Sequence, residues 1–212
     1  MLNDVVIIEK KHTNAAKTLF DRVMRDIKPK FIISISGEVG TGKCEIAHEL
    51  GRLLIESGKQ VKVLLLDNYY FVEPRERNEW REKNGLEKIG YDEYNWNLVN
   101  SNIDDFRMNN KSVMPVVDLF TQRVDQLHTD FDGIDVLIIA GLYSIKINQS
   151  DLRVFIELTY EDTWDEQKYT HKEVLDQFRV EILKHEHKAV QSLKPLADFY
   201  IDFDTAGEIF HL

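Results

Sequence analysis

Hydrophobic positions along the chain follow two spacings. Short aliphatic runs such as FIISIS (31–36) and VLIIAG (136–141) are too short for ordinary helices. Such runs are typical of strands that are buried on both faces. Elsewhere, as at 14–27, apolar residues recur every three or four positions, which predicts helices with one apolar side. The chain therefore reads as strands separated by amphipathic helices.

The two spacings define a full set of expected elements. The expected strands are 5–9, 31–36, 61–67, 136–141, 153–158 and 197–204, with a pair of short strands at 112–120 and 123–128. The expected helices are 14–27, 43–57, 95–108 and 171–193. Strands that alternate with helices in this way form a mainly parallel sheet with helices on both faces. We therefore expect an α/β fold in three layers.

Composition and charge narrow the class of protein. The chain has 212 residues, 43% of them hydrophobic, and a net charge of −10. An acidic surface disfavours nucleic-acid partners, and the single cysteine excludes an internal disulfide framework. No repeat, linker, targeting signal or membrane-spanning run is recognisable. We expect one cytoplasmic domain that binds neither nucleic acid nor membrane, and a homo-oligomer is left open.

The stretch GEVGTGKC at 37–44 lies between an expected strand and an expected helix. Seven of its eight positions fit the phosphate-binding pattern G-x-x-x-x-G-K-[ST]. Glycines let backbone N–H groups approach phosphate oxygens, the helix adds its positive N-terminal end, and the lysine places a cation over the β- and γ-phosphates. The alternative is a glycine turn without a ligand, and the strand–loop–helix context favours the phosphate site. The predicted nucleotide-binding residues are Gly37, Gly40, Thr41, Gly42, Lys43 and Cys44.

Cys44 is the position that departs from the pattern, because a hydroxyl that binds magnesium is expected there. Mg²⁺ prefers oxygen ligands, and a neutral thiol is a poor substitute. Nucleotide binding does not depend on this residue, since the loop amides and Lys43 are present. Two interpretations stay open, a small residue that is tolerated and a redox-active thiolate favoured by the helix N-terminus.

Six segments occur in the order found in uridine kinases and phosphoribulokinases: GEVGTGKC, LLLDNYY, YDEYNW, PVVDLF, IIAGLY and ADFYIDFD. From about Lys30 onward the chain resembles this family of P-loop kinases, most specifically in the loop and the acid that follows the next strand. The resemblance implies a P-loop NTPase-type three-layer α/β fold and a single domain over 1–212. It also implies that 1–29 is an addition, 68–94 an excursion at the acceptor site and 160–193 a lid-like helical region.

The resemblance further implies an enzyme that uses ATP or GTP with Mg²⁺ to phosphorylate a hydroxyl of a small molecule such as a nucleoside. Lys43 and Asp67 are the implied catalytic residues, with Asp67 as the base or as a metal ligand. An acid at the carboxyl end of a parallel strand also points independently to the crevice where α/β proteins bind ligands. The alternative for Asp67 is a turn or helix-capping residue.

The acceptor site is implied by looser matches. Tyr69 follows Asp67 in LDNYY, Asp92 stands in YDEYNW, which resembles FDHPDAFD, and PVVDLFTQR resembles PxYDFxxHxR. In the last segment Val117 and Gln122 replace family residues, and an ordinary hairpin with polar turns is the alternative. On the helix at 171–193, a solvated face is the alternative to a phosphate-binding arginine. The implied acceptor and phosphate contacts are Tyr69, Asp92, Asp118, Arg123 and Arg179.

Two further departures bear on activity. Ala140 stands where the family usually has glutamate. The arginine-rich lid motif of the family is missing, and the alternative basic donors are Arg75, Arg77 and Arg81. These changes favour a second hypothesis, a non-catalytic nucleotide-binding or regulatory protein. We favour the kinase, because Lys43 and the base candidate are both present. The histidines at 185 and 187 are interpreted as surface residues.

Overall fold

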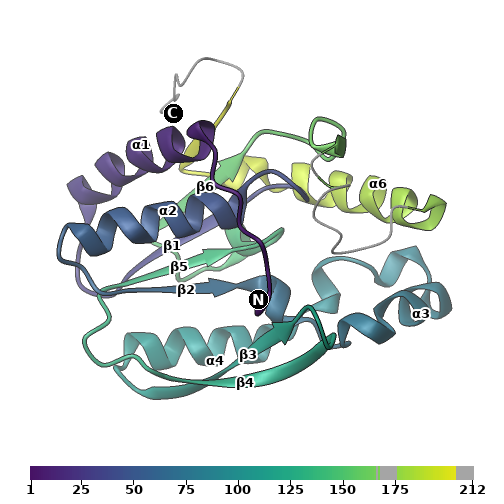
Figure 1. The fold of residues 1–212 in the computed structure, drawn as a ribbon, viewed down its shortest axis with the longest axis horizontal. Coiled ribbons are helices and arrows are strands. Elements are labelled where there is room, and N and C mark those ends of the chain that lie inside the picture. Colours follow the sequence, from purple (N-terminus) through teal and green to yellow (C-terminus); the bar gives the residue numbers. More distant parts are fainter. Residues whose placement is uncertain (166, 168–175, 204–212) are drawn as a thin grey trace.

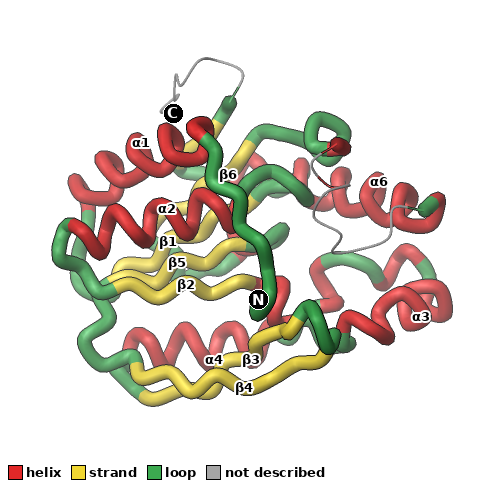
Figure 2. The backbone as a smooth tube through the Cα atoms, viewed as in Figure 1, coloured by secondary structure: helices red, strands yellow, loops and turns green. Residues whose placement is uncertain are grey.

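The computed structural model describes residues 1–165, 167 and 176–203 of the chain. Its centre is a five-stranded sheet in the order β2-β5-β1-β6-β7, in which every neighbouring pair is parallel (Figures 1 and 2). The strands are β1 (Phe31–Ser36), β2 (Val61–Leu65), β5 (Val136–Ala140), β6 (Leu152–Ile156) and β7 (Phe199–Ile201). The predicted α/β fold with a mainly parallel sheet is confirmed.

Helices cover both faces of this sheet, which makes three layers (Figure 1). Alternate residues of β1 separate the two faces, since Ile33 and Ile35 pack in one apolar cluster and Ile32 in the other. The first cluster includes α1 (Lys10–Asp26) and α2 (Lys43–Glu56). The second includes α4 (Trp96–Arg107) and part of the antiparallel hairpin of β3 (Lys111–Asp118) and β4 (Arg123–Asp130). Burial on both faces explains the uninterrupted aliphatic runs.

The strand predicted at 5–9 is wrong. These residues have no regular secondary structure, and Val5 and Ile7 stay 76% and 63% exposed. Leu2 is held beside the end of β3 by backbone hydrogen bonds with Val117 and Leu119, and α1 begins only at residue 10. The intervening segment therefore spans from the hairpin to α1, as Figure 1 shows, instead of pairing along a strand.

The excursion predicted at 68–94 folds into short helices. They are η1 (Leu66–Tyr69), α3 (Pro74–Asn84), η2 (Leu86–Lys88) and η3 (Tyr91–Glu93). A buried ion pair joins α3 to η3, because Arg81 Nε lies 2.7 Å from Glu93 Oε1 and the Arg81 side chain is only 1% exposed. Glu93 Oε2 also accepts the backbone N–H of Gly90 at 2.7 Å. This pair fixes how the excursion folds back on itself.

The last described residues, 176–203, contain a helix and the short strand β7. The helix predicted at 171–193 is present as α6 (Gln177–Gln191), preceded by residues 168–175 that lie outside the described part. The described residues also include the short η4 (Ser144–Lys146) and η5 (Lys194–Leu196). Of the helices in the described ranges, none is long and apolar enough to cross a bilayer.

The Arg81–Glu93 pair yields a prediction on stability. Glu93→Gln leaves Arg81 buried without its closest carboxylate, and breaking a buried pair from one side costs about 3 kcal/mol or more of the free energy of unfolding. Arg75→Ala, on the same helix, removes an exposed pair with Glu73 and should cost about 0.5 kcal/mol or less. Urea unfolding of both variants measures the difference. Equal losses would show that the buried pair does not hold the excursion.

Candidate active site

The phosphate loop joins β1 to α2 at the carboxyl edge of the sheet, so that strand, loop and helix follow one another as the motif requires. Gly40 and Gly42 have φ angles of 79° and 83°, in the left-handed region that favours glycine. A Cβ on Gly42 would lie 2.7 Å from His12 Nε2 of α1, and one on Gly40 would lie 2.7 Å from Thr163 Oγ1. Both the backbone conformation and the close neighbours therefore require glycine here.

Two side chains of the loop bond to one carbonyl. Thr41 Oγ1 donates to the carbonyl oxygen of Glu38 at 2.9 Å, and Lys43 Nζ donates to the same oxygen at 2.5 Å. Both side chains are buried, so their positions are set by the loop and not by solvent. The ammonium group of Lys43 therefore lies against the backbone of the loop itself.

The pairing of three strands places Asp67 near this loop. Ala140 at the end of β5 is in register with Ile35 of β1 on one side and Leu65 of β2 on the other. Gly37 and Asp67 each follow two residues after those partners. Because parallel strands end at the same edge, Asp67 and the phosphate loop leave the sheet together, one strand apart.

Two tyrosines that the sequence did not single out, Tyr70 and Tyr94, lie within the electrostatic influence of Asp67. The hydroxyl of Tyr94 donates to that of Tyr70 at 2.6 Å, and the guanidinium of Arg77 lies 3.7 Å from the centre of the Tyr70 ring. Burial, followed by the charge of Glu186, raises the pKa of Tyr70, and the Asp67 carboxylate adds to this effect. Burial also raises the pKa of Tyr94 well above its ordinary value. Both hydroxyls therefore keep their protons beside the candidate base.

The side chain of Tyr69 points away from this group. It is 1% exposed, and its hydroxyl donates to Asn102 Oδ1 of α4 at 2.8 Å inside the apolar cluster beneath the sheet. Consecutive residues of a short helix face different sides, so Tyr70 and not Tyr69 lies beside Asp67. The structure gives no support for the predicted contact between Tyr69 and an acceptor.

Asp118 and Arg123 close the turn of the β3–β4 hairpin, where they pair in register. Asp118 accepts hydrogen bonds from Asn3 Nδ2 at 2.7 Å and from the N–H of Phe120 at 2.9 Å. The bond from Asn3, followed by that from Phe120, lowers the pKa of Asp118. These contacts are those of a turn-forming aspartate. The N–H of Val117 bonds to Asn68 Oδ1 at 3.0 Å, which places the hairpin turn next to the segment that carries Asp67.

The two remaining predicted residues, Asp92 and Arg179, lie on different elements and differ in burial. Asp92 is exposed on η3, whereas Arg179 is buried on α6 with its Nη1 3.7 Å from Glu186 Oε2. Glu186 also lies 3.8 Å from Arg81 Nη2, so Arg179 belongs to the charged group that holds the excursion. Arg81 is likewise engaged in ion pairs, while Arg75 pairs with Glu73 and Glu76 at the surface.

The donor set available for a magnesium ion is small. Among the described residues no three His, Cys, Asp or Glu side chains gather as a metal site. Cys44 lies in the first turn of α2 and forms no disulfide. Mg²⁺ commonly keeps several waters and uses one or two carboxylates together with nucleotide phosphates. Asp67 therefore fits an ion that is brought by the nucleotide and not one held by the protein alone.

Curated proteins that are similar to the chain include uridine kinases. Uridine kinases of Ureaplasma urealyticum serovar 10 and Ureaplasma parvum serovar 3 are each 30% identical to the chain over 138 residues. The matched region covers 61% of this chain and 63% of each relative. The chain therefore spans slightly less than two thirds of the length of these relatives.

Solved structures share the fold. A possible uridine kinase from Bacillus stearothermophilus superposes with a TM-score of 0.61 at 18% identity, covering 88% of this chain and 97% of that one. Phosphoribulokinase from Rhodobacter spheroides gives 0.60 at 12% identity, covering 81% of this chain and 69% of that one. At these identities the likeness shows the fold, which is that of P-loop kinases.

The sequence model of one family matches residues 32–173, which is more than half of the chain and includes the phosphate loop, Asp67 and the hairpin. The match begins within β1, so α1 lies outside it. With the parallel sheet and the position of the loop, this match assigns the protein, and the chain belongs to the phosphoribulokinase / uridine kinase family.

Proposed function

We propose that this protein transfers the γ-phosphoryl group of ATP to a hydroxyl of a small molecule, in the manner of a uridine kinase. The observation that carries the proposal is that Asp67 and the phosphate loop leave the sheet at the same edge, on either side of β5. A phosphate cradle and an acid at that spacing are what phosphoryl transfer to a hydroxyl requires. Membership of the family and the uridine kinase relatives support the same reaction.

The proposed roles follow from the positions of the groups. The loop amides and the N-terminus of α2 bind the phosphate oxygens, and Lys43 stabilises the charge that develops on them. Asp67 orients the acceptor hydroxyl and takes its proton as the oxygen bonds to the γ-phosphorus and the bond to ADP breaks. Tyr70 and Tyr94 are proposed to orient the acceptor beside Asp67. Mg²⁺, held by the nucleotide phosphates and Asp67, would neutralise phosphate charge when bound.

A second candidate function is nucleotide binding without transfer. It is favoured by Cys44 and Ala140, since both positions lack the oxygen ligand expected at the metal side of the site. The phosphate loop and Lys43 are common to the two functions. The metal dependence of turnover separates them.

Nucleotide binding is tested at Lys43. Lys43→Ala removes a charge-assisted contact with phosphate, and the Kd for MgATP should rise about tenfold or more. Lys111→Ala, which removes an exposed lysine at the start of β3, is the control and should bind as wild type does. Isothermal calorimetry on the three proteins gives the comparison. Equal affinity of wild type and Lys43→Ala for MgATP would show that the loop is not the nucleotide-binding site.

The base is tested at Asp67. Asp67→Asn should leave the Kd for MgATP within a few-fold and reduce phosphotransfer by roughly 10²-fold, the usual effect of a positioned base. The assay follows phosphorylated product with a panel of nucleosides and pentoses as acceptors. Asp132→Asn, at an exposed position before β5, controls for the loss of a carboxylate. Weaker nucleotide binding with unchanged turnover would give Asp67 a different role.

The metal side of the site is tested by restoring both oxygen ligands. Cys44→Ser with Ala140→Glu should lower the magnesium concentration needed for half-maximal turnover by more than either change alone, because residues that share one ion are coupled. Ala140 is buried, so circular dichroism and thermal unfolding must first show that each variant folds. A double variant with the wild-type magnesium titration and rate would favour binding without transfer.

A further inference from the structure

The second residue of the phosphate loop, Glu38, is a buried carboxylate with 2% of its surface exposed. The motif leaves this position free, so the pattern G-x-x-x-x-G-K-[ST] does not account for an acid here. Burying a carboxylate without partners costs several kcal/mol, and a negative charge beside a phosphate site opposes anion binding. The partners of Glu38 therefore show what the charge is used for.

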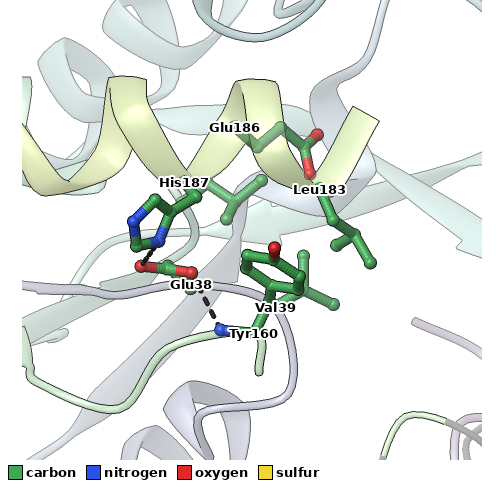
Figure 3. Close-up of a pocket in the computed structure, with 7 residues that line it drawn as sticks. Glu38, Val39, Tyr160, Leu183, Glu186 and His187 are labelled. Atoms are coloured by element: carbon green, nitrogen blue, oxygen red, sulfur yellow. Dashed lines mark hydrogen bonds and ion pairs between the residues drawn. The ribbon is translucent and has the colours of Figure 1, made fainter. Parts of the chain in front are cut away.

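Three N–H groups from outside the loop bond to this carboxylate. The backbone N–H of Tyr160, which follows β6, donates to Oε2 at 2.8 Å. From α6, His187 Nδ1 lies 2.8 Å from Oε1, and Gln191 Nε2 donates to the same oxygen. Figure 3 shows His187 and Glu38 pointing toward each other with the ring of Tyr160 beside them. Both oxygens are thus occupied by donors.

His187, interpreted from the sequence as a surface residue, has 38% of its side chain exposed and also contacts the Glu38 carboxylate. Its ring also meets that of Tyr160 edge-on, with centroids 5.7 Å apart. His187 and Gln191 are four residues apart on α6, so they lie on the same side of the helix and reach the loop together. The contact joins parts of the chain separated by 149 positions.

The backbone carbonyl of Glu38 links these side-chain contacts to the phosphate site. Its carbonyl oxygen accepts the bonds from Thr41 Oγ1 and Lys43 Nζ described above. The side chain of Glu38 is thus fixed to α6 and Tyr160, while its carbonyl fixes the lysine that is proposed to contact phosphate. A shift of Glu38 would move the lysine and the loop amides with it.

The helix that holds Glu38 is itself firmly placed. Ile182, Leu183 and Val190 of α6 are buried, and Glu186, next to His187, lies 3.8 Å from Arg81 Nη2. Since Arg81 pairs with Glu93, α6 contacts the phosphate loop on one side and the excursion on the other. The contacts with α6 therefore hold the loop in a fixed position relative to the rest of the fold.

We propose that Glu38 is a positioning residue that, through His187 and Gln191, holds the phosphate loop and Lys43 in the conformation that receives nucleotide phosphates. The proposal rests on the proposed function, because it takes the loop as the nucleotide site. Glu38 acts through Lys43 and the loop amides and does not itself touch the nucleotide. The N–H donors on its carboxylate offset the repulsion that a free charge would exert on phosphate.

The test compares MgATP binding by calorimetry for wild type, Glu38→Ala, His187→Ala and the double variant, at a temperature where all are folded. Glu38→Ala should raise the Kd about tenfold, the effect of losing one set of charge-assisted hydrogen bonds. His187→Ala should have a smaller effect. The double variant should bind no more weakly than Glu38→Ala, because both changes break the same contact. Glu38→Gln keeps an acceptor oxygen and should recover part of the affinity.

Asp151 provides a matched control at the opposite edge of the sheet. Its carboxylate also accepts a backbone N–H, from Ile32 at 2.9 Å, and pairs with Lys28 and Arg107. Asp151→Asn should lower the melting temperature and leave the Kd for MgATP unchanged. If Glu38→Ala behaves in the same way, with lower stability and unchanged affinity, the positioning role is overturned.

Hydrogen exchange of the loop peptide, measured without nucleotide, separates this proposal from the proposed function. Exchange at 37–43 should be faster in Glu38→Ala and His187→Ala than in wild type and Asp151→Asn. If exchange responds but wild type does not bind MgATP, the proposed function fails and the anchoring of the loop stands. If wild type binds MgATP and neither affinity nor exchange responds to Glu38→Ala, the anchoring is wrong.

Discussion

The parallel pairing of β2, β5 and β1 is the constraint on which the site depends. Parallel neighbours cannot be joined by tight turns, so each strand is followed by a crossover that packs on a face of the sheet. The strands then become buried on both faces, which explains their aliphatic sequences, and all their carboxyl ends emerge at one edge. The phosphate loop and Asp67 are neighbours for this reason alone, although 30 positions separate Gly37 from Asp67.

Buried charge organises what lies beyond that edge. The excursion between β2 and α4 has few aliphatic residues, and α3 buries the side chain of Arg81. Ion pairs from Arg81 to Glu93 and to Glu186 of α6 therefore add to the burial of Tyr69 and Tyr94 in holding this segment. If one partner of such a pair is replaced, the other partner is left as an unpaired charge in the protein interior. This region is therefore sensitive to single substitutions.

The sequence predicted elements best where local pattern and burial agree. The run FIISIS coincides with β1 because its position between two sheet neighbours buries every residue. The predicted strand at 61–67 ends two residues early, since the apolar run continues through Leu66 into a 3₁₀ turn. The run at 5–9 has the same apolar pattern as a strand. The pattern does not say whether a neighbouring strand is available to pair with it.

The residues of the site also differ in how far the local sequence predicts them. The loop could be predicted because its residues are contiguous in a motif, and Asp67 because it follows a recognisable strand, while their roles stay predictions. The contact of Arg77 with the Tyr70 ring, the bond between Tyr94 and Tyr70, and the contact of Glu38 with His187 could not, because each depends on how the chain folds back on itself. The density of aromatic and basic residues at 68–94 was the one local signal for the first two.

The carboxylates at the edge of the sheet bear on how this chain differs from the pattern of its family. The expected acid at the end of β5 is replaced by Ala140, while an acid is present in the loop at Glu38. Glu38 does not substitute for the missing ligand, because one of its oxygens bonds to Tyr160 and the other to His187 and Gln191. Three donors already occupy most of the acceptor sites of this carboxylate and orient it toward α6 and the turn after β6. Its charge is therefore proposed to hold the loop, and Asp67 stays the predicted carboxylate for a nucleotide-bound ion.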